Sequence, residues 1–239
     1  MTLAILQARM SSSRLPGKVL ADLVGAPMIL RQIGRLKRAR RLDRIVVATS
    51  HETSDDTLAH VLDQAGIAVH RGDLNDVLGR FGTALEQWGE TGDVVRLTAD
   101  CPLADPNVID ATIQLHQTSR ADYTSNVADP RTFPKGLDVE VMTTRALRTA
   151  LAEAVDAHDR EHVTPFLYRN PGRFRLAAHS QPRDEGDVRW TVDRPDDLEF
   201  VRAVYEALYP HNAAFSSEDV RALVRIRPDL ARLGGDRRI

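Results

Sequence analysis

Short apolar runs alternate with segments of helical periodicity in the first half of the chain, and this alternation sets the fold class. Runs typical of strands occupy residues 3–8, 45–49, 67–70 and 94–98. Apolar residues spaced three and four apart predict helices over residues 27–39, 53–65, 76–88 and 105–117. Strands that are joined by helices run parallel, and a parallel sheet is covered on both faces. The alternation therefore predicts an α/β fold with a mostly parallel sheet.

The second half of the chain is less regular. We expect strands over residues 123–127, 139–142, 174–178 and 188–192, and helices over residues 144–155, 159–168, 196–208 and 217–224. The end of the chain, from Arg232 onward, is predicted to fray. We find no internal repeat, low-complexity tract or convincing linker, so residues 1–239 are predicted to form one domain.

The composition excludes several classes of protein. A net charge of −2 argues against a nucleic-acid binder that relies on general electrostatic attraction. No apolar segment approaches the ~20 residues that span a bilayer, and the first residues lack the basic start of a signal peptide. The single cysteine, Cys101, excludes an internal disulfide framework and is typical of a reducing compartment. We therefore expect a cytoplasmic protein that binds neither nucleic acid nor membrane.

The loop of residues 7–20, Gln-Ala-Arg-Met-Ser-Ser-Ser-Arg-Leu-Pro-Gly-Lys-Val-Leu, follows the first predicted strand. It brings together three cations, Arg9, Arg14 and Lys18, and three consecutive serines. Backbone N–H groups, hydroxyls and cations that converge after a strand are typical of a polyphosphate site. The spacing matches neither a Walker A loop nor a dinucleotide-binding fingerprint. The alternative is a solvated Ser/Arg turn, because clusters of charge often only face water.

Two aspartates follow predicted strands and are candidate metal ligands. Ligands of such sheets bind beyond the carboxyl ends of the strands, which would gather the loop, Asp100 and other turns around one crevice. Asp100 and Asp193 could share one Mg²⁺, which takes one or two protein carboxylates together with phosphate oxygens and water. Each also has a structural alternative: Asp100 could cap the next turn, and Asp193 could be the N-cap of the helix that follows it.

Two further segments carry polar clusters with open interpretations. Gly72 and Arg80 lie in a turn that leads into a helix, where they could contact a nucleotide, or the helix could simply be capped by Asn75 or Asp76. Residues 158–165 hold two histidines, an arginine and a glutamate, which could bind an acidic substrate or form a polar helix start. The histidine spacing does not match the His-Glu-x-x-His zinc helix.

Taken together, these segments resemble the cytidylyltransferases that make CMP-activated acidic sugars. The nearest likeness is to the SpsF-like branch of spore coat polysaccharide biosynthesis, which is related to the CMP-Kdo and CMP-sialate synthetases. The matching segments are residues 7–20, 46–50, 71–80, 96–102, 136–141, 160–171 and 191–202. The pattern Ala-Arg…Ser-Arg-Leu-Pro-Gly-Lys is highly specific, and Asp-x-Pro-x-Asp-Leu at residues 193–198 is moderately so.

This resemblance implies a three-layer α/β/α, Rossmann-like fold of the nucleotide-diphosphosugar-transferase type. CTP would lie over residues 1–120, residues 121–190 would bind the acceptor and form a homodimer, and residues 191–239 would close the domain. The resemblance implies catalytic roles for Arg14, Lys18 and Asp100, and Mg²⁺ ligation by Asp100 and Asp193. CTP contacts are expected from Arg9, Ser12, Ser13, Arg14, Lys18, Gly72, Arg80 and Thr98. The CMP-Kdo enzymes carry Gln-Gly where Thr98-Ala99 stands here, so base contacts do not transfer.

The implied reaction moves CMP from CTP to an acidic sugar, such as a nonulosonic or Kdo-like acid, and releases pyrophosphate. Acceptor contacts are expected from Lys135, Glu140, Arg160 and His162. One alternative is a glycosyltransferase of the same fold that uses a preformed nucleotide sugar, although that class presents Asp-x-Asp where this chain has Asp100-Cys-Pro. Another alternative is a nucleotide-binding homologue without catalytic activity.

Overall fold

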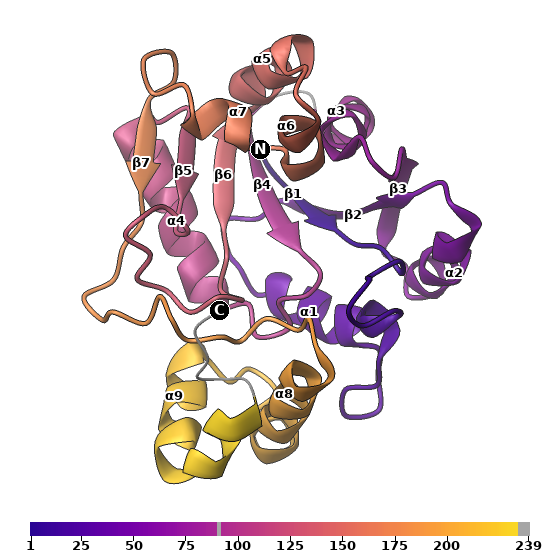
Figure 1. Ribbon diagram of the computed structural model, residues 1–239, viewed down its shortest axis with the longest axis vertical. Helices are drawn as coiled ribbons and strands as arrows, with labels where there is room; N and C mark the ends of the chain where they lie inside the picture. Colours follow the sequence, from indigo (N-terminus) through magenta and orange to yellow (C-terminus); the bar gives the residue numbers. More distant parts are fainter. Residues whose placement is uncertain (90–91, 234–239) are drawn as a thin grey trace.

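A single seven-stranded sheet runs through the molecule (Figure 1). The computed structural model describes residues 1–89 and 92–233. The strand order is β3 (Ala68–Gly72), β2 (Arg44–Ser50), β1 (Thr2–Gln7), β4 (Asp93–Thr98), β6 (Glu140–Thr143), β5 (Tyr123–Ser125) and β7 (Leu176–Ala178). The first four strands in this order are parallel, and β6 pairs antiparallel with both β4 and β5. The prediction of a mostly parallel sheet is confirmed.

Helices cover both faces of the sheet because its central strands are apolar on both sides. In β1, Leu3 and Ile5 pack in one core with α3 (Val77–Trp88) and α5 (Thr144–Glu153). Ala4 and Leu6 point to the opposite face, as alternation along a strand requires, where they pack with α1 (Met28–Leu36), α2 (Asp56–Gln64) and α4 (Pro106–Ser119). Three layers result, with β1 buried at the centre.

A third core joins the end of the described chain to its beginning. The helices α8 (Pro195–Leu208) and α9 (Ser217–Ile226) pack at the lower end of the view in Figure 1, below α1. Their apolar residues, among them Phe200 and Val204, share this core with Leu23, Met28 and Trp190. The segment before α8 is therefore held beside the loop that follows β1.

Two of the predicted elements are wrong in form. Residues 188–192 do not form a strand of the sheet, and Arg189 forms only an isolated parallel bridge with Lys135, which itself lies outside the named strands. Their apolar alternation instead buries Trp190 and Val192 in the third core. The helix predicted over residues 159–168 is divided into α6 (Ala157–His162) and α7 (Pro165–Tyr168). The helix is interrupted because Val163 has a positive φ and because Pro165 has no N–H to continue the hydrogen bonding of α6.

The other predicted strands and helices exist with ends that are shifted by a few residues, and the helix expected from residue 53 begins with a 3₁₀ turn, Thr53–Asp55. The tail that was predicted to fray lies, from residue 234 onward, outside the described residues. No described helix has the length and apolar character needed to cross a bilayer.

The loop after β1 is fastened to the neighbouring strand by a buried carboxylate. Asp55 has no exposed surface and accepts hydrogen bonds from the Met10 N–H at 2.7 Å and the Thr49 hydroxyl at 3.0 Å. Both the N–H and the hydroxyl of Ser50 also donate to it. Burial opposes ionisation of Asp55, but these hydrogen bonds outweigh burial and lower its pKa. The first turn of the loop is thus tied to the carboxyl end of β2.

Replacing Asp55 with alanine is expected to lower the free energy of unfolding by about 3 kcal/mol, because several buried donors lose their acceptor. Asp56→Ala is the matched control. Its carboxylate is 58% exposed and pairs with Arg71 at the surface, so a loss below about 1 kcal/mol is expected. Urea unfolding at neutral pH measures the free energy of unfolding of both variants. Equal losses of this free energy in the two variants would show that Asp55 does not anchor the loop.

Candidate active site

A cavity of about 310 Å³ opens at the carboxyl ends of β1 and β4, and we call it the loop cavity. Besides His162 of α6, its lining includes eight of the predicted site residues: Arg9, Ser12, Ser13, Arg14, Lys18, Thr98, Asp100 and Asp193. They come from the loop after β1, from the end of β4 and from the segment before α8. Residues that are far apart in the sequence therefore meet at the carboxyl edge of the sheet, which is where ligands of parallel sheets bind.

The backbone of the loop curls around one carbonyl oxygen. The N–H groups of Ser12 and Gly17 both donate to the carbonyl of Met10, at 2.9 and 3.0 Å. Gly17 has a φ of +73°, which a residue with a side chain adopts only under strain, so the turn depends on glycine. The turn exposes Arg14 on the outside and buries Lys18.

Lys18 lines the loop cavity, and its ammonium contacts three groups. The ammonium donates to the carbonyl oxygen of Val192 at 2.6 Å and to Asp193 Oδ1 at 2.9 Å. It also lies 3.3 Å from Asp100 Oδ2. A side chain that is only 9% exposed is thus paired with both candidate metal ligands. The two carboxylates converge on one cation position.

Asp193 lies in a strongly positive environment. Arg14 and Arg189 approach its Oδ2 at 3.0 and 2.9 Å, in addition to Lys18 on the other oxygen. Burial alone would raise the pKa of Asp193, but Lys18, Arg189 and Arg14 outweigh it and lower the pKa to about 2. The carboxylate is therefore ionised at neutral pH.

Asp193 is not the N-cap of α8. The N-cap is Arg194, and Asp197 accepts the N–H groups of Asp193 and Arg194, both at 2.9 Å. Asp197 also forms two hydrogen bonds with Arg189, both of 2.8 Å. The helix start is thus satisfied by Asp197, which leaves the carboxylate of Asp193 facing the cavity.

Asp100 accepts hydrogen bonds from side chains. The hydroxyl of Thr98 donates to Oδ1 at 2.6 Å, and the buried thiol of Cys101 lies 3.4 Å from the same oxygen. The described residues contain no group of three or more His, Cys, Asp or Glu side chains that could hold a metal ion. Two carboxylates facing a cavity fit Mg²⁺, whose other ligands are usually phosphate oxygens and water.

A second cavity, of about 420 Å³, adjoins the loop cavity, and we call it the histidine cavity. Its lining is Arg96, Leu97, Thr98, Val127, Arg131, Asp138, Glu140, His158, His162, Thr164, Pro165 and Tyr168. Thr98 and His162 line both cavities. The loop cavity and the histidine cavity therefore meet at these two residues.

The acidic side chains of the histidine cavity are paired. Glu140 forms an ion pair with Arg96 and accepts hydrogen bonds from the hydroxyls of Tyr123 and Thr164, the latter at 2.6 Å. Asp138 forms an ion pair with Arg131. Burial raises the pKa of Asp138 in spite of this arginine. The cavity wall is therefore polar but internally neutralised.

Four predicted site residues lie outside the linings of both cavities: Gly72, Arg80, Lys135 and Arg160. Arg160 donates to Asp76 Oδ1 at 2.8 Å, and Asp76 caps α3 by accepting the Gly79 N–H. Arg80 donates to the Asp73 carbonyl at 2.9 Å, and burial lowers its pKa to about 10.

Gly72 is required by packing, because a Cβ there would lie 2.9 Å from Cγ of Arg80. Lys135 belongs to the bridge that holds Arg189. These contacts give Gly72, Arg80 and Arg160 structural roles at the positions where they occur, whereas the bridge at Lys135 is formed by backbone groups.

The list of predicted site residues did not include several residues of the histidine cavity, among them Arg96, Arg131 and Asp138, and His158 entered only as part of the open cluster at residues 158–165. One signal was available for Arg96, since a charged residue inside the apolar run of a buried strand is uncommon. The others lie in the irregular second half of the chain, where no periodicity assigns a face.

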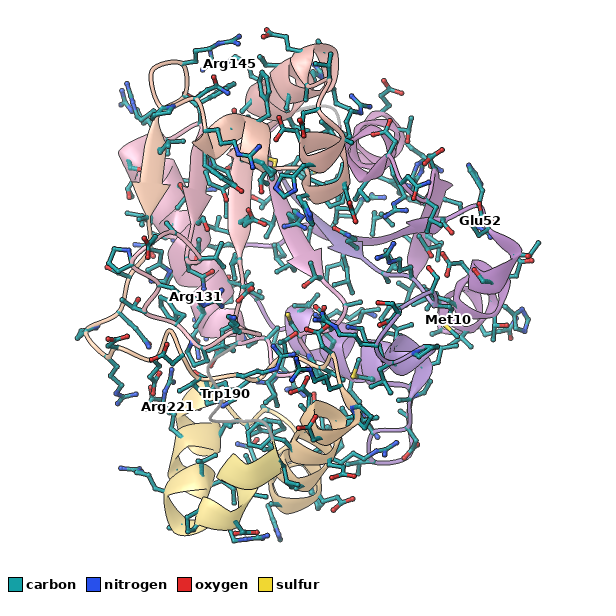
Figure 2. All side chains as sticks on the ribbon, in the orientation of Figure 1. Met10, Glu52, Arg131, Arg145, Trp190 and Arg221 are labelled. Carbon is teal, nitrogen blue, oxygen red and sulfur yellow. The ribbon has the colours of Figure 1, made fainter. Side chains whose placement is uncertain are left out.

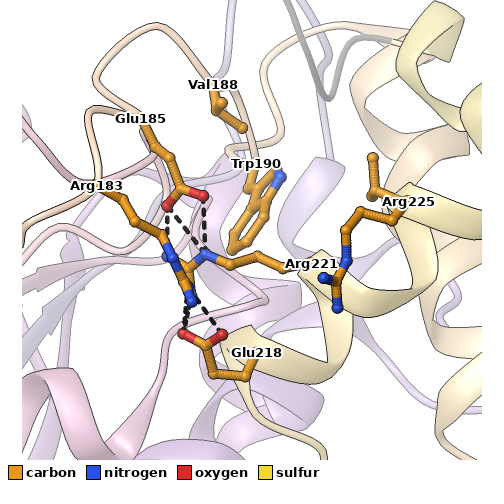
Figure 3. Close-up of a pocket in the computed structure, with 8 residues that line it drawn as sticks. Arg183, Glu185, Val188, Trp190, Glu218, Arg221 and Arg225 are labelled. Carbon is orange, nitrogen blue, oxygen red and sulfur yellow. Dashed lines mark hydrogen bonds and ion pairs between the residues drawn. The ribbon is translucent and has the colours of Figure 1, made fainter.

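A third cavity, of about 330 Å³, lies between α9 and the segment that precedes α8 (Figure 3). The guanidinium of Arg221 lies 5.4 Å from the centre of the Trp190 ring and pairs with Glu185 and Glu218. Arg183 also pairs with Glu218. Of the described residues, none that lines the loop cavity or the histidine cavity also lines this third cavity.

The chain matches known proteins over almost its full length. A family model described as cytidylyltransferase matches residues 3–220. The spore coat polysaccharide biosynthesis protein SpsF of Bacillus subtilis is 32% identical over 237 residues, which cover 96% of each chain. The 3-deoxy-manno-octulosonate cytidylyltransferase of Anaeromyxobacter sp. (strain K) is 40% identical over 111 residues, which cover 46% of this chain and 44% of that protein.

Among solved structures, a cytidylyltransferase from Leptospira borgpetersenii has a TM-score of 0.90 and 28% identity, with 100% of this chain and 98% of that chain covered. The predicted three-layer nucleotidyltransferase-like fold is thus confirmed, and so is the SpsF-like resemblance. The chain belongs to the cytidylyltransferase family.

Proposed function

We propose that this protein transfers CMP from CTP to a hydroxyl group of an acidic sugar and releases pyrophosphate. The observation that carries the proposal is the position of Lys18, whose ammonium lies between Asp100 and Asp193 in a cavity that also contains Arg9 and Arg14. Cations beside paired carboxylates are what a metal-bound triphosphate requires.

In this proposal the triphosphate of CTP occupies the loop cavity. Arg9, Arg14 and Lys18 contact its phosphate oxygens, and the loop serines supply hydroxyl groups. Phosphoryl transfer demands little covalent chemistry from a protein, so positioning and charge neutralisation dominate the rate enhancement. Lys18 and Arg14 stabilise the charge that develops on the departing pyrophosphate.

We propose Asp100 and Asp193 as the residues that hold Mg²⁺. Bound there, Mg²⁺ would neutralise charge on the phosphates of CTP. The low pKa of Asp193 keeps its carboxylate available as a ligand at neutral pH. The ammonium of Lys18 neutralises the same two carboxylates in this structure, and with Mg²⁺ bound there it would contact the phosphates instead.

The acceptor sugar occupies the histidine cavity in this proposal. The two cavities share Thr98 and His162, so an acceptor hydroxyl can approach the α-phosphorus of CTP at that junction. A Kdo-like or nonulosonic acid is the proposed acceptor class, supported by the relative named for 3-deoxy-manno-octulosonate. Glu140 and His162 are the proposed acceptor contacts, whereas the guanidinium of Arg160 is held by Asp76.

From the resemblance to the family we also propose a homodimer in the cytoplasm. Sedimentation equilibrium is expected to give about twice the mass of the 26.6-kDa chain. A mass of one chain over the whole micromolar range would contradict the dimer.

Lys18→Ala and Asp100→Ala are each expected to lower kcat at least about 100-fold, because charge on the reacting phosphates is no longer neutralised. Pyrophosphate release from CTP and Kdo measures the rate, and thermal unfolding checks the fold. Arg14→Ala provides a variant that keeps the fold, since its side chain is 56% exposed, and a loss of about tenfold or more is expected.

The matched control is Arg145→Ala on α5, at the top of Figure 2, whereas Met10 of the loop lies at the lower right. Arg145 is 80% exposed and pairs with Asp122, and its removal should leave the rate unchanged. Folded Lys18→Ala and Asp100→Ala variants that release pyrophosphate at the parental rate would overturn the assignment of these residues.

Metal binding can be measured without turnover. With CTP present, Mn²⁺ used in place of Mg²⁺ is expected to bind at least about tenfold more weakly to Asp100→Asn and Asp193→Asn than to the parent, because each change removes one carboxylate ligand. Electron paramagnetic resonance of free Mn²⁺ gives the affinity. Asp63→Asn, an exposed aspartate on α2, serves as the control. Equal affinities in all four proteins would exclude a metal at the two carboxylates.

A further inference from the structure

One imidazole lies at the junction of the loop cavity and the histidine cavity. His162 and Thr98 line both cavities, but the hydroxyl of Thr98 already donates to Asp100 at 2.6 Å. The ring of His162 forms no hydrogen bond with the residues that the structure describes, and its one ring contact is with His158, at 4.3 Å between centroids. His162 is therefore a free basic group at the place where the two substrates of the proposed reaction would meet.

The carboxylates that line the two cavities are all engaged in ion pairs. Asp193 and Asp100 pair with Lys18, Glu140 pairs with Arg96, and Asp138 pairs with Arg131. A carboxylate in an ion pair is a poor proton acceptor, because protonation would leave its cationic partner uncompensated. His158 lines only the histidine cavity.

The backbone immediately after His162 is strained. Val163 has a φ of +71° and a ψ of −51°, and the Thr164 N–H donates to the His162 carbonyl at 2.8 Å, which defines a classic γ-turn. This conformation is costly for a β-branched residue and persists only where the surroundings enforce it. Strain of this kind concentrates at functional sites.

Contacts on both sides of the turn hold it in place. Before it, Arg160 ties α6 to Asp76 at the start of α3, with a distance of 2.8 Å from Nε to Oδ1. After it, the Thr164 hydroxyl donates to Glu140 at 2.6 Å, and Val163 itself is fully buried. The position of His162 is thus set by contacts with the start of α3 and with β6, whose Glu140 lines the histidine cavity.

The environment keeps the imidazole neutral. Burial lowers the pKa of His162, the neighbouring His158 and the cation of Arg96 lower it further, and the carboxylates of Glu161 and Glu140 act in the opposite direction. The net shift is downward from the usual value of about 6.5. At pH 7 the ring therefore has a nitrogen lone pair that can accept a proton.

We infer that His162 is the general base of the transfer reaction. The inference rests on the proposed function. The acceptor hydroxyl gives its proton to a ring nitrogen of His162 while its oxygen forms a bond to the α-phosphorus of CTP. The bond between the α-phosphorus and the bridging oxygen breaks, and its electron pair leaves with pyrophosphate. The imidazolium then releases the proton to solvent, which restores the neutral ring.

The test compares His162→Gln with the parent by pyrophosphate release from CTP and Kdo between pH 5 and pH 9. We expect kcat to fall about 100-fold or more and the KM for CTP to change less than threefold. The parent should gain activity as pH rises through the pKa of His162, and the variant should lack this acid limb. His60→Gln, at an exposed histidine on α2, should leave both the rate and the profile unchanged.

Two further measurements separate proton transfer from binding. Free imidazole should restore part of the rate of His162→Ala, which a structural role would not allow. His158→Gln removes a neighbour that lowers the pKa of His162, so the acid limb of this variant should move to higher pH.

Two results with an active parent would overturn the inference and leave the proposed function intact. In the first, His162→Gln keeps the parental kcat and pH profile. In the second, His162→Gln raises the KM for the acceptor and changes neither kcat nor the pH profile. A parent that releases no pyrophosphate with any nucleotide and acidic sugar would instead overturn the proposed function.

Discussion

The site depends on one buried cation. Lys18 comes from the loop after the first strand, and its ammonium contacts Val192 and Asp193 near the other end of the chain. Together with Asp100 these groups bring three distant segments to one point. Because an uncompensated buried charge is costly, the ammonium and the two carboxylates hold one another in place. The arrangement of the loop cavity thus follows from charge balance.

Packing supports this arrangement from both ends. The third core places the segment before α8 against the loop, and Asp55 fastens the start of the loop to β2. Asp197 satisfies the beginning of α8, which leaves Asp193 facing the cavity. The γ-turn at Val163 positions its neighbours His162 and Thr164, which both line the histidine cavity. A rigid frame around a polar crevice suits a reaction that depends on positioning.

Much of the fold could be predicted because the first half of the chain has clear periodicity, and the loop with Arg9, Arg14 and Lys18 has a specific pattern. Periodicity shows which side chains are buried but not which part of the molecule they pack against. The apolar alternation around Trp190 therefore predicted a strand, whereas this segment packs its apolar side chains in the third core and forms only an isolated bridge.

Ion pairs across long sequence separations leave no local signal. The pairing of Arg160 with Asp76, 84 residues away, could not be read from the sequence, and neither could that of Arg96 with Glu140, 44 residues away. For the same reason the residues of the histidine cavity were largely missed, whereas those of the loop cavity, which follow strand ends, were found.

The central claim is that the chain joins CMP to an acidic sugar. The most direct measurement is mass spectrometry of the products formed from each of the four nucleoside triphosphates with a panel of Kdo-like and nonulosonic acids. The account predicts a CMP-linked sugar acid, formed from CTP in preference to the other three nucleotides, with one pyrophosphate released for each product. Transfer of a sugar from a nucleotide sugar, or tight CTP binding with no product from any acid, would contradict it.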